Sequence, residues 1–239
     1  MLLSYSFSNF QSFRELTQVS TTVSEKVAPS DWLTATSTGE RINKVIAVMG
    51  ANGSGKTTLL KPLVFLDWFI SHSFSQAPEA AIPFTPHFAT TNEATEFSAT
   101  AIYKGQIWKY VLRCIPERVI HEALYVKRER FKYVFVRDWD DSTQTYRIKQ
   151  QDFGFAPVEA RKVRANASLI STAAQYGIPL AKDMASSGLR SNITALGRQP
   201  LSQDLVLNAA AHFSQLSEQR TIMARLLHDW DLGLSNVEL

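Results

Sequence analysis

The residues best suited to chemistry in this chain lie in one short stretch that could hold a triphosphate. Residues 50–58 read Gly-Ala-Asn-Gly-Ser-Gly-Lys-Thr-Thr, which matches the pattern G-x-x-x-x-G-K-[ST]. Glycines in such a loop let successive backbone N–H groups turn inward toward phosphate oxygens. Lys56 could reach the β- and γ-phosphates, and the Thr57 hydroxyl could ligate Mg²⁺. The pattern therefore predicts binding of a nucleoside triphosphate.

The expected ligand is ATP with Mg²⁺, and Lys56 is the candidate catalytic residue of this loop. Thr57 is the candidate metal ligand. Contacts to the nucleotide are predicted along the whole motif. The predicted residues are Gly50, Asn52, Gly53, Ser54, Gly55, Lys56, Thr57 and Thr58.

The segments on either side of this loop suit the same chemistry. Ile42 to Met49 is an apolar run rich in β-branched residues and predicts a strand. Lys56 to about Ser71 predicts a helix, whose positive dipole end would face the phosphates. The order strand, loop, helix is the one that phosphate binding by this motif requires.

The remaining chain predicts a sheet followed by helices. Alternation in Leu2–Phe10 and Leu16–Val23 predicts a first hairpin, and residues 95–150 predict an antiparallel meander of five strands with a turn at Lys104-Gly105. Ala167–Ser171 is a candidate strand returning to the main sheet. Asp204–Gln219 and Thr221–Asp229 predict helices.

Composition limits the kinds of protein this can be. The 239 residues are 45% hydrophobic with a net charge of +3, enough for a real core and only mildly basic. The single cysteine, Cys114, excludes an internal disulfide and fits a reducing cytoplasm. The N-terminus has no signal-peptide pattern, and no apolar run is long enough to span a membrane.

Several motifs resemble a known family. Ser8-Asn9-Phe10-Gln11-Ser12-Phe13 resembles the "NFrSF" start of the RecF/SMC-like branch of ABC-type ATPases, and Asn52–Thr57 is the P-loop form typical of that branch. Residues 83–125 resemble a bacterial subfamily that includes ATPase subunits of anti-phage systems such as Septu, PARIS and some retrons. Gln11 departs from the family pattern, which commonly has a basic residue there.

The resemblance implies an α/β fold: a P-loop NTPase head with a parallel core sheet, an antiparallel β subdomain and a helical C-terminal part. It implies a P-loop lobe over residues 1–171 and a helical subdomain over 172–239. By order along the chain, Gln175 matches the family's Q-loop residue, which senses Mg²⁺ and the γ-phosphate and would be both catalytic and metal-binding. A surface glutamine on a helix is an equal alternative.

Hydrolysis in this class also needs a Walker B strand that ends in Asp-Glu, and no such string occurs. Val134–Asp138 comes closest, but Arg137 interrupts it, so we reject it. Leu216–Arg220 faintly resembles the ABC signature but lacks its glycines. We therefore expect ATP hydrolysis only in a full-length or assembled form, with these residues as the N-terminal portion of a longer ATPase.

The function implied is that of an ATPase subunit in a cytoplasmic anti-phage complex. At least two ATPase heads would assemble on nucleotide and control an effector nuclease or toxin, with DNA or a phage protein as a possible trigger. The alternatives are a DNA-repair ATPase acting on DNA directly and a nucleotide-binding scaffold without turnover. Basic residues gather near one hairpin and suit either a partner or a charged edge strand. They are Lys127, Arg128, Arg130, Lys132 and Arg137.

Overall fold

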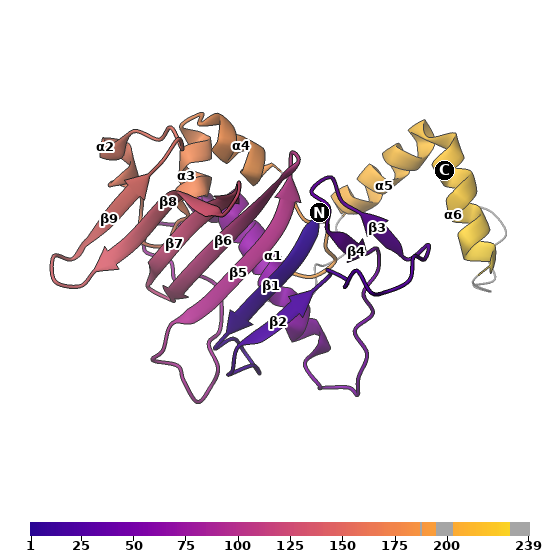
Figure 1. Ribbon diagram of the computed structural model, residues 1–239, viewed down its shortest axis with the longest axis horizontal. Coiled ribbons are helices and arrows are strands. Elements are labelled where there is room, and N and C mark those ends of the chain that lie inside the picture. Colours follow the sequence, from indigo (N-terminus) through magenta and orange to yellow (C-terminus); the bar gives the residue numbers. More distant parts are fainter. Residues whose placement is uncertain (187, 195–202, 230–239) are drawn as a thin grey trace. The chain divides into compact units, whose positions relative to one another are not determined.

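A seven-stranded antiparallel sheet forms the body of the first compact unit, Met1–Gly197 (Figure 1). The computed structural model describes residues 1–186, 188–194 and 203–229. The strand order is β2-β1-β5-β6-β7-β8-β9. The strands are β1 (Leu2–Ser8), β2 (Thr17–Ser20), β5 (Thr95–Tyr103), β6 (Gln106–Ile115), β7 (Arg118–Lys127), β8 (Phe131–Asp140) and β9 (Thr145–Gln150).

The structure confirms the predicted first hairpin and the meander over residues 95–150. Each strand of the meander pairs with the next along the chain, as alternating sequence and short turns dictate. Lys104 and Gly105 form the turn between β5 and β6 with φ angles of 48° and 74°. Positive φ at both positions is what a two-residue hairpin needs to match the twist of its strands.

One face of this sheet carries the apolar core. The cross-strand row Tyr5, Ala99, Tyr110, Leu124 and Phe135 lies on that face, because directly paired residues share a side of the sheet. All of these except Ala99, which is partly buried, are fully buried. The alternation of buried and exposed residues along the strands thus leaves one apolar face for helices to cover.

The helix after the P-loop, α1 (Lys56–His72), covers that face. Phe65, Leu66 and Phe69 of α1 are buried, and the Phe65 ring lies 4.7 Å from that of Phe97 on β5. The Tyr5 hydroxyl donates a hydrogen bond of 2.8 Å to the Leu59 carbonyl. These contacts hold α1 against β1 and β5, and the Tyr5 bond to Leu59 does so close to the P-loop end of the helix.

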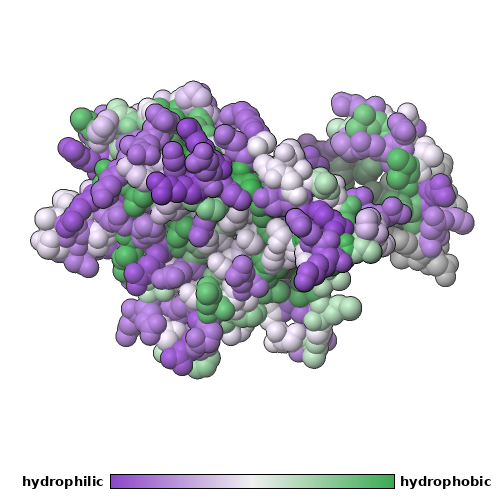
Figure 2. Space-filling model, in the orientation of Figure 1, coloured by the Kyte–Doolittle hydropathy of each residue, from purple (hydrophilic) through white to green (hydrophobic). Residues whose placement is uncertain are grey.

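The opposite face of the sheet is more polar, although the paired residues Ile102 and Ile107 join a small buried apolar cluster there with Leu3 and Ile42. Ser4, Thr100 and Lys109 pair in one cross-strand row and are only partly buried. Figure 2 shows hydrophilic side chains gathered over the β6–β8 part of the molecule. The exposed hairpin between β7 and β8 contributes Lys127, Arg128, Arg130 and Lys132 there.

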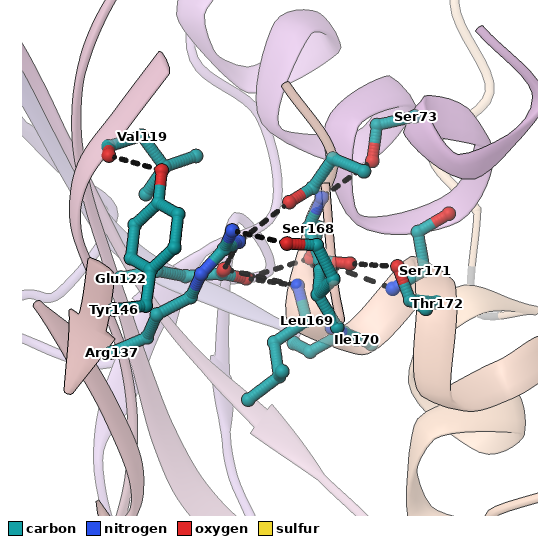
Figure 3. Close-up of polar contacts among 12 residues, drawn as sticks. Ser73, Val119, Glu122, Arg137, Tyr146, Ser168, Leu169, Ile170, Ser171 and Thr172 are labelled. Atoms are coloured by element: carbon teal, nitrogen blue, oxygen red, sulfur yellow. Dashed lines mark hydrogen bonds and ion pairs between the residues drawn. The ribbon is translucent and has the colours of Figure 1, made fainter. Parts of the chain in front are cut away.

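Arg137 is not part of that basic surface, contrary to the grouping made from sequence. Its side chain is fully buried and ion-paired with Glu122 on the neighbouring strand, with 3.4 Å between Nη1 and Oε2 (Figure 3). The guanidinium also donates to the carbonyls of Ala167 and Arg164, both at 2.8 Å. Its central carbon lies 3.8 Å from the centre of the Tyr146 ring. The inward-facing position on β8 and these acceptors explain the burial of this cation.

Glu122 connects the same cluster to a helix. Its carboxylate accepts hydrogen bonds from the hydroxyls of Tyr110 and Ser168, at 2.8 and 2.7 Å, and from the Leu169 backbone N–H at 3.0 Å. Burial and the nearby Glu122 charge raise the pKa of Tyr110 and of the Cys114 thiol well above their usual ranges. Cys114 is therefore a neutral core residue.

The segment Ala167–Ser171 leads into a helix that begins at Leu169, so its interpretation as a strand is wrong. Ser168 caps α3 (Leu169–Gln175), and its hydroxyl oxygen accepts hydrogen bonds from the backbone N–H groups of Ile170 and Ser171. A serine followed by a short apolar run suits a helix start as well as a strand. The other short helices are η1 (Ser73–Ser75), α2 (Pro157–Ala160) and α4 (Pro179–Ala185).

The first compact unit extends to Gly197, beyond the boundary expected at residues 171 and 172. Helices α3 and α4 pack against α1, so they belong with the P-loop lobe. The second unit, Arg198–Leu239, contains α5 (Gln203–Gln215) and α6 (Ser217–Asp229), close to the predicted helices. Neither these nor any other helix in the described part of the chain is long and apolar enough to cross a bilayer.

The expected parallel core sheet does not occur among the described residues. Only Ile42 and Asn43 of the predicted strand before the P-loop lie in a strand, β4 (Arg41–Asn43), which pairs antiparallel with β3 (Leu33–Ala35). Residues 44–49 have no strand partner, and Val45, Ile46 and Met49 are 64%, 45% and 87% exposed. β-branched composition favours an extended backbone, but a strand forms only where a neighbour supplies hydrogen bonds.

Candidate nucleotide-binding site

The P-loop and the turn after β1 together form an open cavity of about 430 Å³. Most predicted contact residues line it, while Gly50 and Asn52 do not. Two further lining residues, Gln11 and Ser12, come from the turn between β1 and β2. The lining is Gln11, Ser12, Gly53, Ser54, Gly55, Lys56, Thr57 and Thr58.

Glycine is required at the junction of the loop and α1. Gly55 caps the helix with a φ of 88°, in the left-handed region that other residues rarely adopt. A Cβ atom on Gly55 would lie 3.3 Å from the Ser12 hydroxyl and 3.4 Å from the Phe13 ring. Both the backbone conformation and the close approach of the β1–β2 turn therefore select glycine. Gly55 has no side chain to cap the first backbone N–H groups of α1, so these groups remain available for a ligand.

The Lys56 side chain folds back onto the start of the P-loop. Its ammonium donates to the backbone carbonyls of Gly50 and Ala51, at 2.8 and 2.7 Å. These contacts are exposed to solvent, so they are readily exchanged for the stronger charge-assisted bonds that phosphate oxygens would offer. Lys56 thus places a positive charge at the cavity, where an anionic ligand could bind it.

Gln11 connects the β1–β2 turn to α1. Its Oε1 accepts hydrogen bonds from the Thr58 hydroxyl and the Lys61 ammonium, both at 3.3 Å. Its backbone N–H donates to the Thr85 carbonyl at 2.9 Å. The sequence singled out Gln11 only as a departure from a family pattern. In the structure, the turn Asn9–Phe13 places Gln11 at the cavity, and both Asn9 and Gln11 have positive φ there.

Gln175 does not join these residues. It is the exposed last residue of α3, and the cavity lining does not include it. The Ser171 hydroxyl on the same helix accepts a hydrogen bond from the Phe74 backbone N–H, just beyond the C-terminal end of α1. Lys56 begins that 17-residue helix, roughly 25 Å away along its axis. Order along the chain thus pointed to a glutamine at the wrong end of α1.

Comparison with protein families identifies the domain that contains the P-loop. Residues 45–196, more than half of the chain, match the family described as "AAA domain, putative AbiEii toxin, Type IV TA system". No curated protein matches the sequence. The matched range contains the P-loop, α1, the whole meander and α3. The chain therefore belongs to this family of AAA domains and is a P-loop NTPase.

Proposed function

We propose that this chain binds ATP–Mg²⁺ in the P-loop cavity. The observation that carries the proposal is the convergence of the Lys56 ammonium and the glycine-capped start of α1 on one polar cavity. Backbone N–H groups and the helix dipole favour phosphate, and Lys56 adds a full positive charge. Thr57, the second residue of the helix, presents a hydroxyl for Mg²⁺.

Replacing Lys56 tests this directly. Lys56→Ala removes a charge-assisted contact to phosphate worth ~1.5–3 kcal/mol, so we expect ATP affinity to fall by about one to two decades in calorimetric titration. Lys149→Ala, an exposed lysine on β9, is the matched control and is expected to bind as the parent does. Equal ATP affinity in the parent and Lys56→Ala would contradict the proposal.

The biological setting that we propose is an ATPase subunit of a bacterial defence or toxin–antitoxin complex in the cytoplasm. The matched family description names a type IV toxin system, and the resemblance to anti-phage ATPases points the same way. In this proposal two ATPase heads close on bound nucleotide, and closure controls a separate nuclease or toxin. Nucleotide stabilises the closed assembly by its higher affinity for that state.

Light scattering on the native complex tests the switching step. With ATP we expect a larger assembly than without it, and we expect Lys56→Ala to behave as the nucleotide-free form does. The retained effector is measured on the same samples by gel electrophoresis. If neither assembly size nor effector retention responds to ATP or to Lys56→Ala, nucleotide-controlled switching is wrong.

That result would support the second candidate function, a nucleotide-binding scaffold without turnover. The observation that favours it is the composition of the cavity wall, which in the described part of the chain contains no carboxylate. The exposed basic hairpin at Lys127–Lys132 would suit the further alternative of a DNA-repair ATPase, because cations there could contact phosphates of DNA.

A further inference from the structure

Phe88 exposes an aromatic ring on a loop that is otherwise firmly held. The exposed fraction of the Phe88 side chain is 83%. The loop Thr85–Thr90 is nevertheless held by hydrogen bonds to the buried side chain of Asn9. The Asn9 Oδ1 atom accepts hydrogen bonds from the His87 backbone N–H at 3.0 Å and the Thr90 hydroxyl at 2.6 Å. Its Nδ2 donates to the carbonyls of Thr90 and Glu93, at 3.1 and 2.8 Å. A ring on so constrained a loop is presented in a fixed position.

The turn also orients the ring. The rings of His87 and Phe88 lie with their centroids 4.3 Å apart and a tilt of 37°. The Ala89 backbone N–H donates to His87 Nδ1 at 3.2 Å, which holds the imidazole in place. Phe88 is therefore supported on one side by His87 and open on the other. A flat apolar surface that is already ordered loses little entropy when a second ring stacks on it.

This loop borders the P-loop cavity on the Gln11 side. The Thr85 carbonyl accepts the Gln11 N–H, and Gln11 lines the cavity. Phe88 lies three positions after Thr85, a span of at most about 11 Å. The loop and the P-loop both lie at the end of the sheet where β1 ends and β5 begins (Figure 1).

The cavity itself has no surface suited to a nucleobase. Its described lining is made of glycine, serine, threonine, glutamine and lysine, which suit phosphates and hydroxyl groups. A base held by this protein must find an aromatic or apolar surface outside the phosphate cavity. Phe88 supplies such a surface across Gln11.

We propose that the open face of Phe88 stacks on the base of the bound nucleotide and that the loop Thr85–Thr90 is the base-binding part of the site. The inference rests on the proposed binding of ATP at Lys56. The phosphates would occupy the P-loop cavity and the ribose would cross the Gln11 turn. Because every base has a π face, such stacking supplies affinity with little choice between purines.

Paired titrations of the full chain with Mg-ATP and with inorganic tripolyphosphate separate the two halves of the site. Phe88→Ala is expected to weaken ATP binding about tenfold and to leave tripolyphosphate binding unchanged. Phe88→Trp is expected to retain ATP affinity. Phe131→Ala, an exposed phenylalanine at the opposite end of the sheet, is the matched control and is expected to bind both ligands as the parent does.

The outcomes distinguish this inference from the function on which it rests. If Phe88→Ala binds ATP as the parent does while Lys56→Ala does not, the base is held elsewhere and only the stacking proposal is overturned. An equal loss of ATP and tripolyphosphate in Phe88→Ala would also overturn it, because the loop would then support the phosphate cavity. If the parent binds neither ligand, the proposed function itself fails.

Discussion

Arg137→Ala is expected to lower the free energy of unfolding by about 3–5 kcal/mol, the range for breaking one partner of a buried ion pair. The substitution leaves the carboxylate of Glu122 buried without its counter-charge. It also leaves the carbonyls of Val163, Arg164 and Ala167 without the guanidinium donors that they now have. Urea unfolding followed by tryptophan fluorescence measures the change.

The size of this effect follows from where the pair lies. Glu122 and Arg137 hold the central meander on one side and the cap of α3 on the other, through Ser168 and Leu169 (Figure 3). Arg147, whose side chain is 70% exposed where it pairs with Asp140, is the matched control. Arg147→Ala is expected to cost at most about 1 kcal/mol, as surface ion pairs do.

A double substitution distinguishes charge from shape. Glu122→Leu with Arg137→Met removes both charges at similar volume, so its cost is expected to be well below the sum of the two single substitutions. Additive costs would show that the pair is not coupled. An Arg137→Ala variant within about 0.5 kcal/mol of the parent would contradict the assignment of Arg137 as the cation that joins sheet and helix.

Local pattern predicted the parts of the fold whose causes are local. The meander follows from alternation and from turns such as Lys104-Gly105, and α1 follows from a glycine-rich start and an apolar run. The P-loop residues form a contiguous motif, so their convergence on one cavity could be predicted in the same way. Each of these features is determined within about ten residues.

Features that depend on partners far away in the chain could not be predicted from the sequence. The sequence grouped Arg137 with surface cations, because its neighbours in the chain do not indicate that Glu122, Val163 and Ala167 are its partners. Ile42–Met49 has strand composition, yet only Ile42 and Asn43 of this run lie in a strand, because β4 ends there. Gln175 was placed by order along the chain, which says nothing about which end of α1 a later helix will contact.

Three carboxylates near the P-loop helix or the Walker B-like string have other partners. Asp138, at the end of the rejected Walker B-like string, lies 2.6 Å from the His121 ring nitrogen Nδ1. Glu122 is enclosed by its own hydrogen bonds. Asp67 lies eleven positions beyond Lys56 on α1, where its Oδ1 accepts the Leu189 N–H at 2.8 Å. None of the three lines the P-loop cavity.

Residues 1–239 on their own are therefore expected to bind ATP and to turn it over slowly. A positioned general base contributes about 10²–10⁴-fold to such a reaction, so the rate should fall to roughly 0.01 s⁻¹ or below against about 1 s⁻¹ for an ordinary enzyme. Phosphate release at saturating ATP measures it, with Lys56→Ala as the blank for contaminating ATPases. Turnover near 1 s⁻¹ that disappears in Lys56→Ala would mean that a carboxylate of this chain reaches the γ-phosphate after all. A slow rate that rises when the native partner is added would instead place the missing base on that partner, because the P-loop already supplies the phosphate-binding half of the chemistry.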